Sequence, residues 1–256
     1  EGGAELMLKE GLFTRYQPEA VFGMHIGLNM AGGKIAVRSG PAMAAVDEFR
    51  IKVQGKQTHG ARPWGGIDPI VVGSQIILGL QTIASRQLQI TKVPYIITVG
   101  QFTAGIRNNI IPDEAHMWGT IRSFDKGMQN EIHERIEQTA SGIAASAGTT
   151  ADVSIRRQYP VTYNDPGLTE KMMPTLERIT NNNVITPDLV TGAEDFSFFA
   201  DEVPGLFLFL GAAPPEANAK ALPGNHSPLF TIHEPNMEVG VRAMSHLVWD
   251  YLDMEQ

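Results

Sequence analysis

Apolar and polar residues alternate through the middle of the chain in a way that predicts a small α/β unit. Phe49, Ile51 and Val53 alternate with polar neighbours, the pattern of a strand with one solvent-exposed face. The expected elements after it are a helix over 68–85, strands over 93–102 and 114–124, a helix over 126–146 and a strand over 151–157. Residues 48–157 therefore read β-α-β-β-α-β, the order of a ferredoxin-like fold with two helices on one face of an antiparallel sheet.

The flanking segments have the character of a second α/β unit. The expected elements are a helix over 3–11, a buried strand over 20–25, a helix over 168–181, a strand over 206–210 and a helix over 236–251. Gly27, Gly32 and Gly33 predict a loop directly after the first of these strands. Because the ends of a compact domain lie close together, 48–157 can be an insertion. We predict one domain formed by 1–47 and 158–256, short of strands for a complete sheet, and a second formed by 48–157.

Composition narrows the classes of function. The 256 residues include 28 acidic and 20 basic ones, a net charge of −8 without any basic run, which argues against binding to nucleic acid. No apolar run reaches the ~18 residues of a membrane span and no secretion signal is visible, so we expect no membrane partner and a cytoplasmic location. With no cysteine, disulfides and iron–sulfur clusters are excluded within these residues, whereas a metal held by histidine and carboxylate is not.

Familiar catalytic signatures are absent, so the chemistry must come from scattered residues. There is no G-x-S-x-G, no phosphate loop, no G-x-G-x-x-G and no H-E-x-x-H. His25 ends a predicted strand, where ligands bind in α/β folds, but a histidine there can equally be bonded to backbone. His226, in a loop, and His59, in a loop beside glycines, are each either solvated or ligand-binding. His116, His133 and His246 are interpreted as structural or exposed.

Three further positions have both a structural and a functional interpretation. Glu194 and Asp195 stand at the expected start of a helix, where acids cap free N–H groups, or they form part of an active site. Arg122 ends a strand, and its guanidinium is suited to a substrate carboxylate. Asn109 lies in a tight loop, where asparagine is common for backbone reasons.

The order of these motifs is more informative than any one of them. The series is M-H at 24–25, G-K-x-x-H-G-A at 55–61, D-P-I at 68–70, S-R at 85–86, N-x-I-P at 109–112, G-T-x-R at 119–122, G-A-E-D-F-S at 192–197 and H-S-P at 226–228. Together they resemble the M20 metallopeptidase family, above all its amidohydrolase branch of hippurate and N-acyl- or indoleacetyl-amino-acid hydrolases. The resemblance implies an α/β metal-binding domain interrupted by a lid domain that mediates homodimerisation.

The resemblance also implies roles for particular residues. His25 and His226 would be ligands of two divalent metal ions, zinc or manganese, with Glu1 as a candidate for a glutamate ligand. His59 would stabilise the oxyanion in the partner subunit's site, and Glu194 would support the metals, which makes these two the candidate catalytic residues. Asn109 and Arg122 would hold the substrate. The implied reaction is metal-dependent hydrolysis of the amide bond of an N-acyl amino acid.

The chain departs from the family at its start. Members carry M-H-x-C-G-H-D and P-A-E-E segments upstream; the first is absent, and the second survives at most as Glu1. We therefore expect a hydrolase that has lost its N-terminal part, in which this chain alone holds one metal ion or none and turns over little. Two alternatives stay open: a non-catalytic, dimerising or ligand-binding remnant, and one half of a split enzyme.

Overall fold

The computed structural model describes residues 2–254 and divides the chain into two compact units. Unit 1 is formed by Glu1–Met43, Thr162–Val190 and Glu194–Gln256. Unit 2 is formed by Ala44–Val161 with Thr191–Ala193, so it begins before the predicted residue 48 and ends after the predicted residue 157. Within the described residues, no helix is long and apolar enough to cross a membrane.

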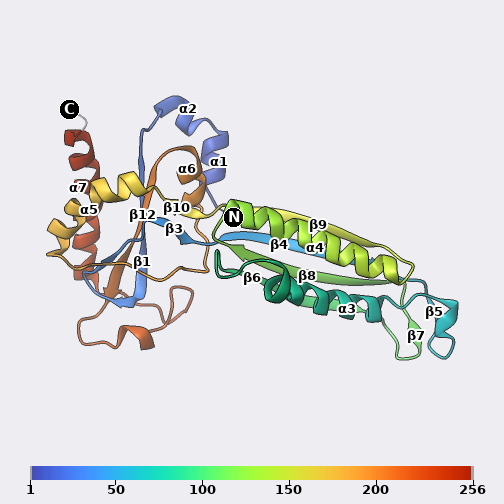
Figure 1. The fold of residues 1–256 in the computed structure, drawn as a ribbon. Coiled ribbons are helices and arrows are strands. Elements are labelled where there is room, and N and C mark those ends of the chain that lie inside the picture. The colour runs from blue at the N-terminus through green and yellow to red at the C-terminus, as the bar shows by residue number, and fades with distance from the viewer. Residues whose placement is uncertain (1, 255–256) are drawn as a thin grey trace. The chain divides into compact units, whose positions relative to one another are not determined.

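Unit 2 is built on an antiparallel sheet of four strands in the order β6-β8-β4-β9 (Figure 1). The strands are β4 (Ala45–Gln54), β6 (Tyr95–Ala104), β8 (Glu114–Ser123) and β9 (Ala151–Tyr159). Helices α3 (Pro69–Thr82) and α4 (Lys126–Ser146) share one apolar core with the inward side chains of the sheet, such as Phe49 and Ile121. Gly119 has no room for a side chain, since a Cβ there would lie 2.2 Å from the Phe49 ring.

Short elements complete unit 2. They are β5 (Thr58–His59), η1 (Pro63–Gly65), the π-helical turn η2 (Ile83–Gln87) and β7 (Ile110–Ile111). The two long helices begin at aspartate caps: the Asp68 carboxylate accepts from the Ile70 amide at 2.9 Å, and that of Asp125 accepts from the Met128 amide at 2.8 Å. These caps satisfy amides that the helix itself leaves without a partner.

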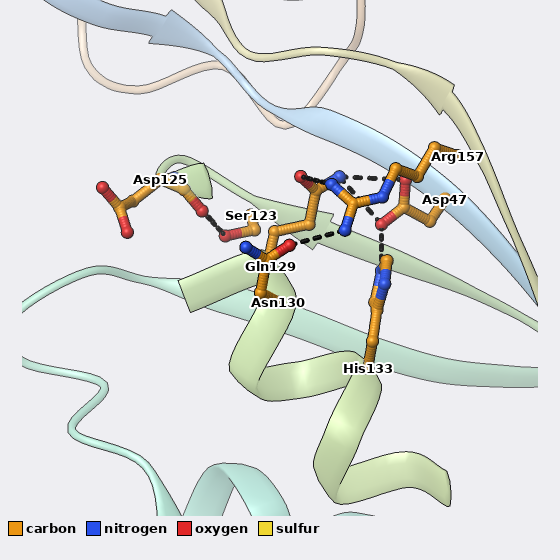
Figure 2. A network of polar contacts seen from close by, with 7 residues as sticks. All are labelled: Asp47, Ser123, Asp125, Gln129, Asn130, His133 and Arg157. Carbon is orange, nitrogen blue, oxygen red and sulfur yellow. Dashed lines mark hydrogen bonds and ion pairs between the residues drawn. The ribbon is translucent and has the colours of Figure 1, made fainter. Parts of the chain in front are cut away.

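A buried polar network joins α4 to the first residues of β4 (Figure 2). The Asp47 side chain is 1% exposed, and its carboxylate accepts from the Gln129 amide at 2.9 and 3.0 Å. The His133 ring nitrogen lies 2.5 Å from the same carboxylate. Arg157 of β9 donates to Gln129 and to Asn130, which ties the outer strand to the same turn of the helix. His133, predicted to be structural or exposed, is part of this network.

Unit 1 has a mixed sheet of four strands in the order β1-β12-β2-β11. The strands are β1 (Val21–Ala31), β2 (Ile35–Ala36), β11 (Val184–Ile185) and β12 (Gly205–Ala213), with β1 parallel to β12 and β2 antiparallel to it. A separate ribbon pairs β3 (Gly40–Met43) with β10 (Thr162–Asn164). Helices α5 (Pro166–Thr180) and α7 (Met237–Met254) pack against each other and share one apolar core with the sheet.

The remaining elements of unit 1 are short. They are α1 (Ala4–Lys9), α2 (Leu12–Tyr16), α6 (Phe196–Glu202), η3 (Ala219–Ala221) and η4 (Glu234–Asn236). Helix α6 contributes Phe196 to an aromatic cluster in which its ring centroid lies 5.3 Å from that of Phe207. This cluster packs where α6 meets β12.

The structure corrects one expectation in unit 1 and confirms another. The loop predicted directly after His25 is wrong, because β1 continues through Gly27 to Ala31, with an irregular register between those two residues. The short helix predicted over 3–11 and closed by Gly11 is confirmed, because α1 ends at Lys9 and the φ of Gly11 is left-handed at +87°; the helix α2 that follows was not predicted. Glycine adopts that conformation without strain, so it separates two helices here.

Candidate active site

His25 is held by a backbone carbonyl in an orientation that leaves one ring nitrogen free. The residue lies opposite Phe209 of β12, and its Nδ1 is 2.9 Å from the Ile26 carbonyl oxygen. Because a carbonyl only accepts, Nδ1 carries the hydrogen of the neutral ring and Nε2 keeps its lone pair. Such a second contact is typical of metal-binding histidines. The sequence left open whether His25 bonds the backbone or binds a ligand. In the structure both are possible at once, because the backbone bond uses Nδ1 and a ligand would use Nε2.

Asn225 ties the loop that carries His226 to β1. Its side-chain nitrogen donates to the Ile26 carbonyl oxygen at 2.6 Å and lies 3.4 Å from the His25 Nδ1. The shorter contact is the hydrogen bond, since Nδ1 already donates its hydrogen to the same carbonyl. His226, which is exposed, is therefore attached next to the strand that carries His25. The sequence interpretation did not identify Asn225 as a functional residue, although it directly precedes His226, the first residue of the H-S-P motif.

Glu194 and Asp195 lie directly before α6, as predicted, but Asp195 caps a different helix. Its carboxylate accepts from the Gly3 and Ala4 amides at 2.8 and 3.0 Å, which places the start of α1 beside it. Helix α6 has no side-chain cap. The Glu194 carboxylate accepts from the Asp195 amide at 3.1 Å. The first described residues of the chain thus lie next to the candidate acids.

The electrostatics connect Glu194 with His25. Burial raises the pKa of the Glu194 carboxyl above its ordinary value, and the neighbouring Asp195 raises it further. Positive charge on His25 acts in the opposite direction and lowers that pKa. His25 therefore lies near Glu194 in the fold, although the two residues are far apart in the sequence.

The candidate side chains are of the types that bind divalent metal ions, but too few of them lie together. Imidazole nitrogen and carboxylate oxygen are ordinary ligands of zinc and manganese. Among residues 2–254, however, no three histidine or acidic side chains lie close enough together to hold an ion. The predicted ligand Glu1 falls outside the described residues. The described residues therefore do not form a two-metal site by themselves.

Unit 2 brings His59 and Asn109 together. Strand β5 pairs with β7, so that His59 is opposite Ile110, and the Gly60 amide donates to the Asn109 carbonyl at 2.8 Å. The Nδ1 of His59 accepts from the Ala61 amide at 3.0 Å. Since Nδ1 is an acceptor, the hydrogen of the neutral ring is on Nε2, and this exposed side chain is a hydrogen-bond donor.

Arg122 is a half-buried cation at the other end of β8. Burial lowers the pKa of its guanidinium, and no carboxylate in the described part of the chain pairs with it. It stands eight residues along β8 from Glu114, a separation of roughly 26 Å in a strand. Glu114 follows β7 closely, so within one unit 2 Arg122 is distant from His59 and Asn109.

Comparison with known proteins assigns the family. The model of peptidase family M20/M25/M40 matches residues 1–250. Thermostable carboxypeptidase 2 of Saccharolobus solfataricus is 36% identical over 94% of this chain and 60% of its own length. N-acetyl-L-cysteine deacetylase of Bacillus subtilis is 34% identical over 91% of this chain and 53% of its own length. The chain belongs to the M20/M25/M40 peptidase family.

A solved structure supports the same assignment. The Bacillus subtilis YXEP protein, described as a dinuclear metal-binding peptidase of the M20 family, superposes with a TM-score of 0.76 and 28% identity. The superposition covers 95% of this chain and 60% of that one. The chain thus spans 53% to 60% of the length of these relatives. The family resemblance predicted from the ordered motifs is confirmed.

Proposed function

We propose that this chain is the larger part of a metal-dependent hydrolase that cleaves the amide bond of small N-acyl amino acids. The observation that carries the proposal is the arrangement around the Ile26 carbonyl, which holds His25 with a free Nε2 and, through Asn225, the loop of His226. Family relatives named as a thermostable carboxypeptidase and as an N-acetyl-L-cysteine deacetylase support this reaction class.

In this proposal His25 and His226 hold two divalent cations, zinc or manganese, together with ligands from outside the described residues. Glu1 is a candidate among these, because the Gly3 amide bonds Asp195 only two residues later in the chain. The cations would supply polarisation of the amide carbonyl and activation of the attacking water. Glu194, close to His25, would steady the ligands.

The residues of unit 2 would act on the substrate. His59 would donate its Nε2 hydrogen to the carbonyl oxygen as negative charge develops there. Asn109 would bond the substrate beside it, and Arg122, which lacks a carboxylate partner, would bind the substrate carboxylate. We propose unit 2 as the ferredoxin-like lid of the enzyme.

The separation within unit 2 favours a homodimer. A small N-acyl amino acid is much shorter than the roughly 26 Å between the two ends of β8, so one copy of unit 2 cannot present both Arg122 and His59 to it. We propose that Arg122 serves the site of its own chain and His59 that of the partner copy. A cytoplasmic location stays a prediction from the sequence.

A second candidate is a non-catalytic, dimerising or ligand-binding remnant of such an enzyme. The observation that favours it is the lack, among residues 2–254, of any cluster of three possible metal ligands. The two candidates differ in metal binding. The hydrolase proposal expects weak metal binding by this chain alone, and two tight sites once the missing family segment is present.

The test compares residues 1–256 with the longer protein encoded by the parent gene. Metal titration by calorimetry and hydrolysis of N-acetyl and N-benzoyl amino acids, with and without chelator, are measured on both. We expect chelator-sensitive hydrolysis by the longer protein only. Two tight metal sites in residues 1–256 alone would contradict the expected incompleteness, and a longer protein that binds metal but hydrolyses none of these substrates would favour the remnant.

Mixing of variants tests the assignment of residues to the two copies. In the longer protein, Arg122→Ala and His59→Ala should each be nearly inactive, whereas the matched variant Arg156→Ala, an exposed arginine of β9, should be unaffected. Mixed dimers contain one site with both defects and one with neither, so mixing should restore roughly a quarter of the wild-type activity. Absence of any recovery in verified mixed dimers would place both residues in one copy's site.

A further inference from the structure

The two most exposed large apolar side chains that the structure describes lie in two loops of unit 2. Ile106 is 91% exposed and Trp64 is 82% exposed. Trp64 is the middle residue of η1, which follows β5, and Ile106 stands in the loop that joins β6 to β7. Single exposed apolar residues are common on protein surfaces, so the informative feature is that these two share one place in the fold.

The two loops meet at the end of unit 2 that carries His59 and Asn109. Strands β5 and β7 pair there (Figure 1), and the Gly60 amide donates to the Asn109 carbonyl oxygen at 2.8 Å. Ile106 comes three residues before Asn109, and Trp64 comes five residues after His59. The exposed apolar side chains therefore belong to the same loop end as the two residues that we assign to the substrate.

Backbone hydrogen bonds, and not the indole ring, hold the loop of Trp64 in shape. Lys56 and Ile67 bond each other at its base, with amide-to-carbonyl distances of 3.0 and 3.1 Å. Within the loop, the Arg62 amide donates to the His59 carbonyl oxygen at 2.8 Å. These bonds fix the turn of Trp64 relative to His59. Since the ring itself is mostly in solvent, it is available for contact with a ligand.

The proposed reaction determines which part of the substrate this loop end would meet. His59 would donate to the carbonyl oxygen of the scissile amide, and that carbonyl belongs to the acyl group. The amino-acid part would be held through its carboxylate by Arg122, which lies roughly 26 Å from the loop end within one copy of unit 2. Apolar side chains beside His59 would therefore contact the acyl group.

We propose that Trp64 and Ile106 form the contact surface for the acyl group, and that the enzyme prefers N-acyl amino acids with an aromatic or other large apolar acyl group over N-acetyl amino acids. A benzoyl ring covers much more of an indole surface than an acetyl methyl group does, and burial of that surface favours binding. The inference rests on the proposed function and adds the class of acyl group to it.

The test measures kcat/KM of the longer protein for the N-benzoyl and N-acetyl derivatives of the same amino acid. We expect a ratio of about ten or more in favour of the benzoyl substrate. Trp64→Ala should lower this ratio about tenfold, mainly through a loss on the benzoyl substrate, whereas Trp64→Phe should keep most of it because an aromatic ring remains. Ile106→Ala should lower the ratio by about threefold.

Trp118→Ala is the matched control. Trp118 is also an exposed tryptophan of unit 2, at 41%, but it lies on strand β8 with the Arg50 guanidinium 4.5 Å above its ring and not in the two loops. Its removal should leave the ratio unchanged. The inference is overturned if Trp64→Ala leaves the ratio unchanged, if Trp118→Ala lowers it as much, or if the original protein prefers the N-acetyl substrate.

Failure of the inference and failure of the proposed function give different results. If the longer protein hydrolyses neither substrate, the proposed function fails, and calorimetric binding of the two N-acyl amino acids to the metal-loaded protein decides the inference. Tighter binding of the benzoyl compound that is lost in Trp64→Ala would support the acyl contact. Equal affinities, or no binding of either compound, would overturn it.

Discussion

The two four-stranded sheets of the chain differ in the residues and the regularity of their edge strands. In unit 2, the outer strand β9 carries Asp152, Arg156 and Arg157, and the other outer strand, β6, has an irregular register between Val99 and Gln101. Charges and bulges at an edge discourage further pairing. In unit 1, the outer strand β1 has neither a charged residue nor a proline, and its irregularity falls only after Gly27.

This difference indicates that the outer strands of the unit 2 sheet discourage further pairing, whereas β1 of unit 1 has none of these features among the described residues. Two helices and the inward face of the sheet enclose the core of unit 2, and the network around Asp47 fastens α4 to two strands. The core of unit 1 is well packed beneath α5 and α7 but ends at a strand with no buried residue among its described side chains. Stability should therefore reside mainly in unit 2.

The largest expected effect comes from the core of unit 2. Ile136→Ala on α4 removes a side chain that is 0% exposed, and it should lower the free energy of unfolding of unit 2 by about 3 kcal/mol. Hydrogen exchange read separately for the amides of each unit measures it. If the two units fold independently, exchange in unit 1 should stay unchanged. Equal losses in both units would show that they unfold together and would remove the contrast.

A smaller effect is expected from the polar network. Asp47→Ala removes the acceptor of Gln129 and His133, and the buried donors left behind should cost unit 2 about 2 kcal/mol. Asp152→Ala, an exposed aspartate of the same sheet, is the control and should change stability by less than about 0.5 kcal/mol. A double-mutant cycle with His133→Ala measures the pair directly; strictly additive losses would mean that the two residues are not coupled.

The sequence was most informative where elements are long and strongly patterned. The helices predicted over 68–85 and 126–146 correspond to α3 and α4, and period-two alternation identified β4. The strands β2 and β11 have two residues each, too few for any period to appear, and they form through pairing with distant segments. The continuation of β1 past His25 was missed because glycine is normally a strand breaker, whereas pairing with β12 decides the conformation here.

The candidate site shows the same limit. Residues in the ordered motifs could be chosen from the sequence, and β5–β7 pairing does bring His59 to Asn109. Sequence could not give the Asn225 bond to the Ile26 carbonyl or the capping of α1 by Asp195, because each joins segments that are about two hundred residues apart. Local propensity does not encode such contacts. The distance between Arg122 and His59 likewise follows only from the order of the strands.

The next effect concerns the helix pair of unit 1 and depends on pH. Asp250 of α7 accepts from the Thr175 hydroxyl at 2.5 Å and from Arg178 of α5, and these bonds lower the pKa of its carboxyl against the opposing effect of burial. A carboxyl with a lowered folded-state pKa stabilises the fold above its unfolded-state pKa, and this contribution is lost as pH falls through the folded-state value.

Asp250→Asn should therefore lower the stability of unit 1 by about 1 kcal/mol at neutral pH and by progressively less in acid. Unfolding by denaturant at a series of pH values from about 7 down to about 3 measures the difference between the variant and the original chain. Asp253→Asn, an exposed neighbour on the same helix, serves as the control. A difference that grows toward acid would contradict the direction of the pKa shift.

The smallest expected change in the free energy of unfolding comes from exposed apolar residues on one helix of each unit. Trp249→Glu and Leu78→Glu each replace an exposed apolar residue on a helix, one in each unit, and each should change the stability of the isolated chain by less than about 0.5 kcal/mol. In unit 2, Leu78→Glu should leave the free energy of unfolding almost unchanged under all conditions. In unit 1, Trp249→Glu should likewise cost little while the chain is monomeric, because Trp249 is 72% exposed and its side chain keeps its contact with water. Denaturant unfolding with light scattering on the isolated chain measures both. A loss above about 1 kcal/mol for Trp249→Glu in a monomeric isolated chain would mean that another part of the chain covers Trp249, and the two helix positions would then not be equivalent.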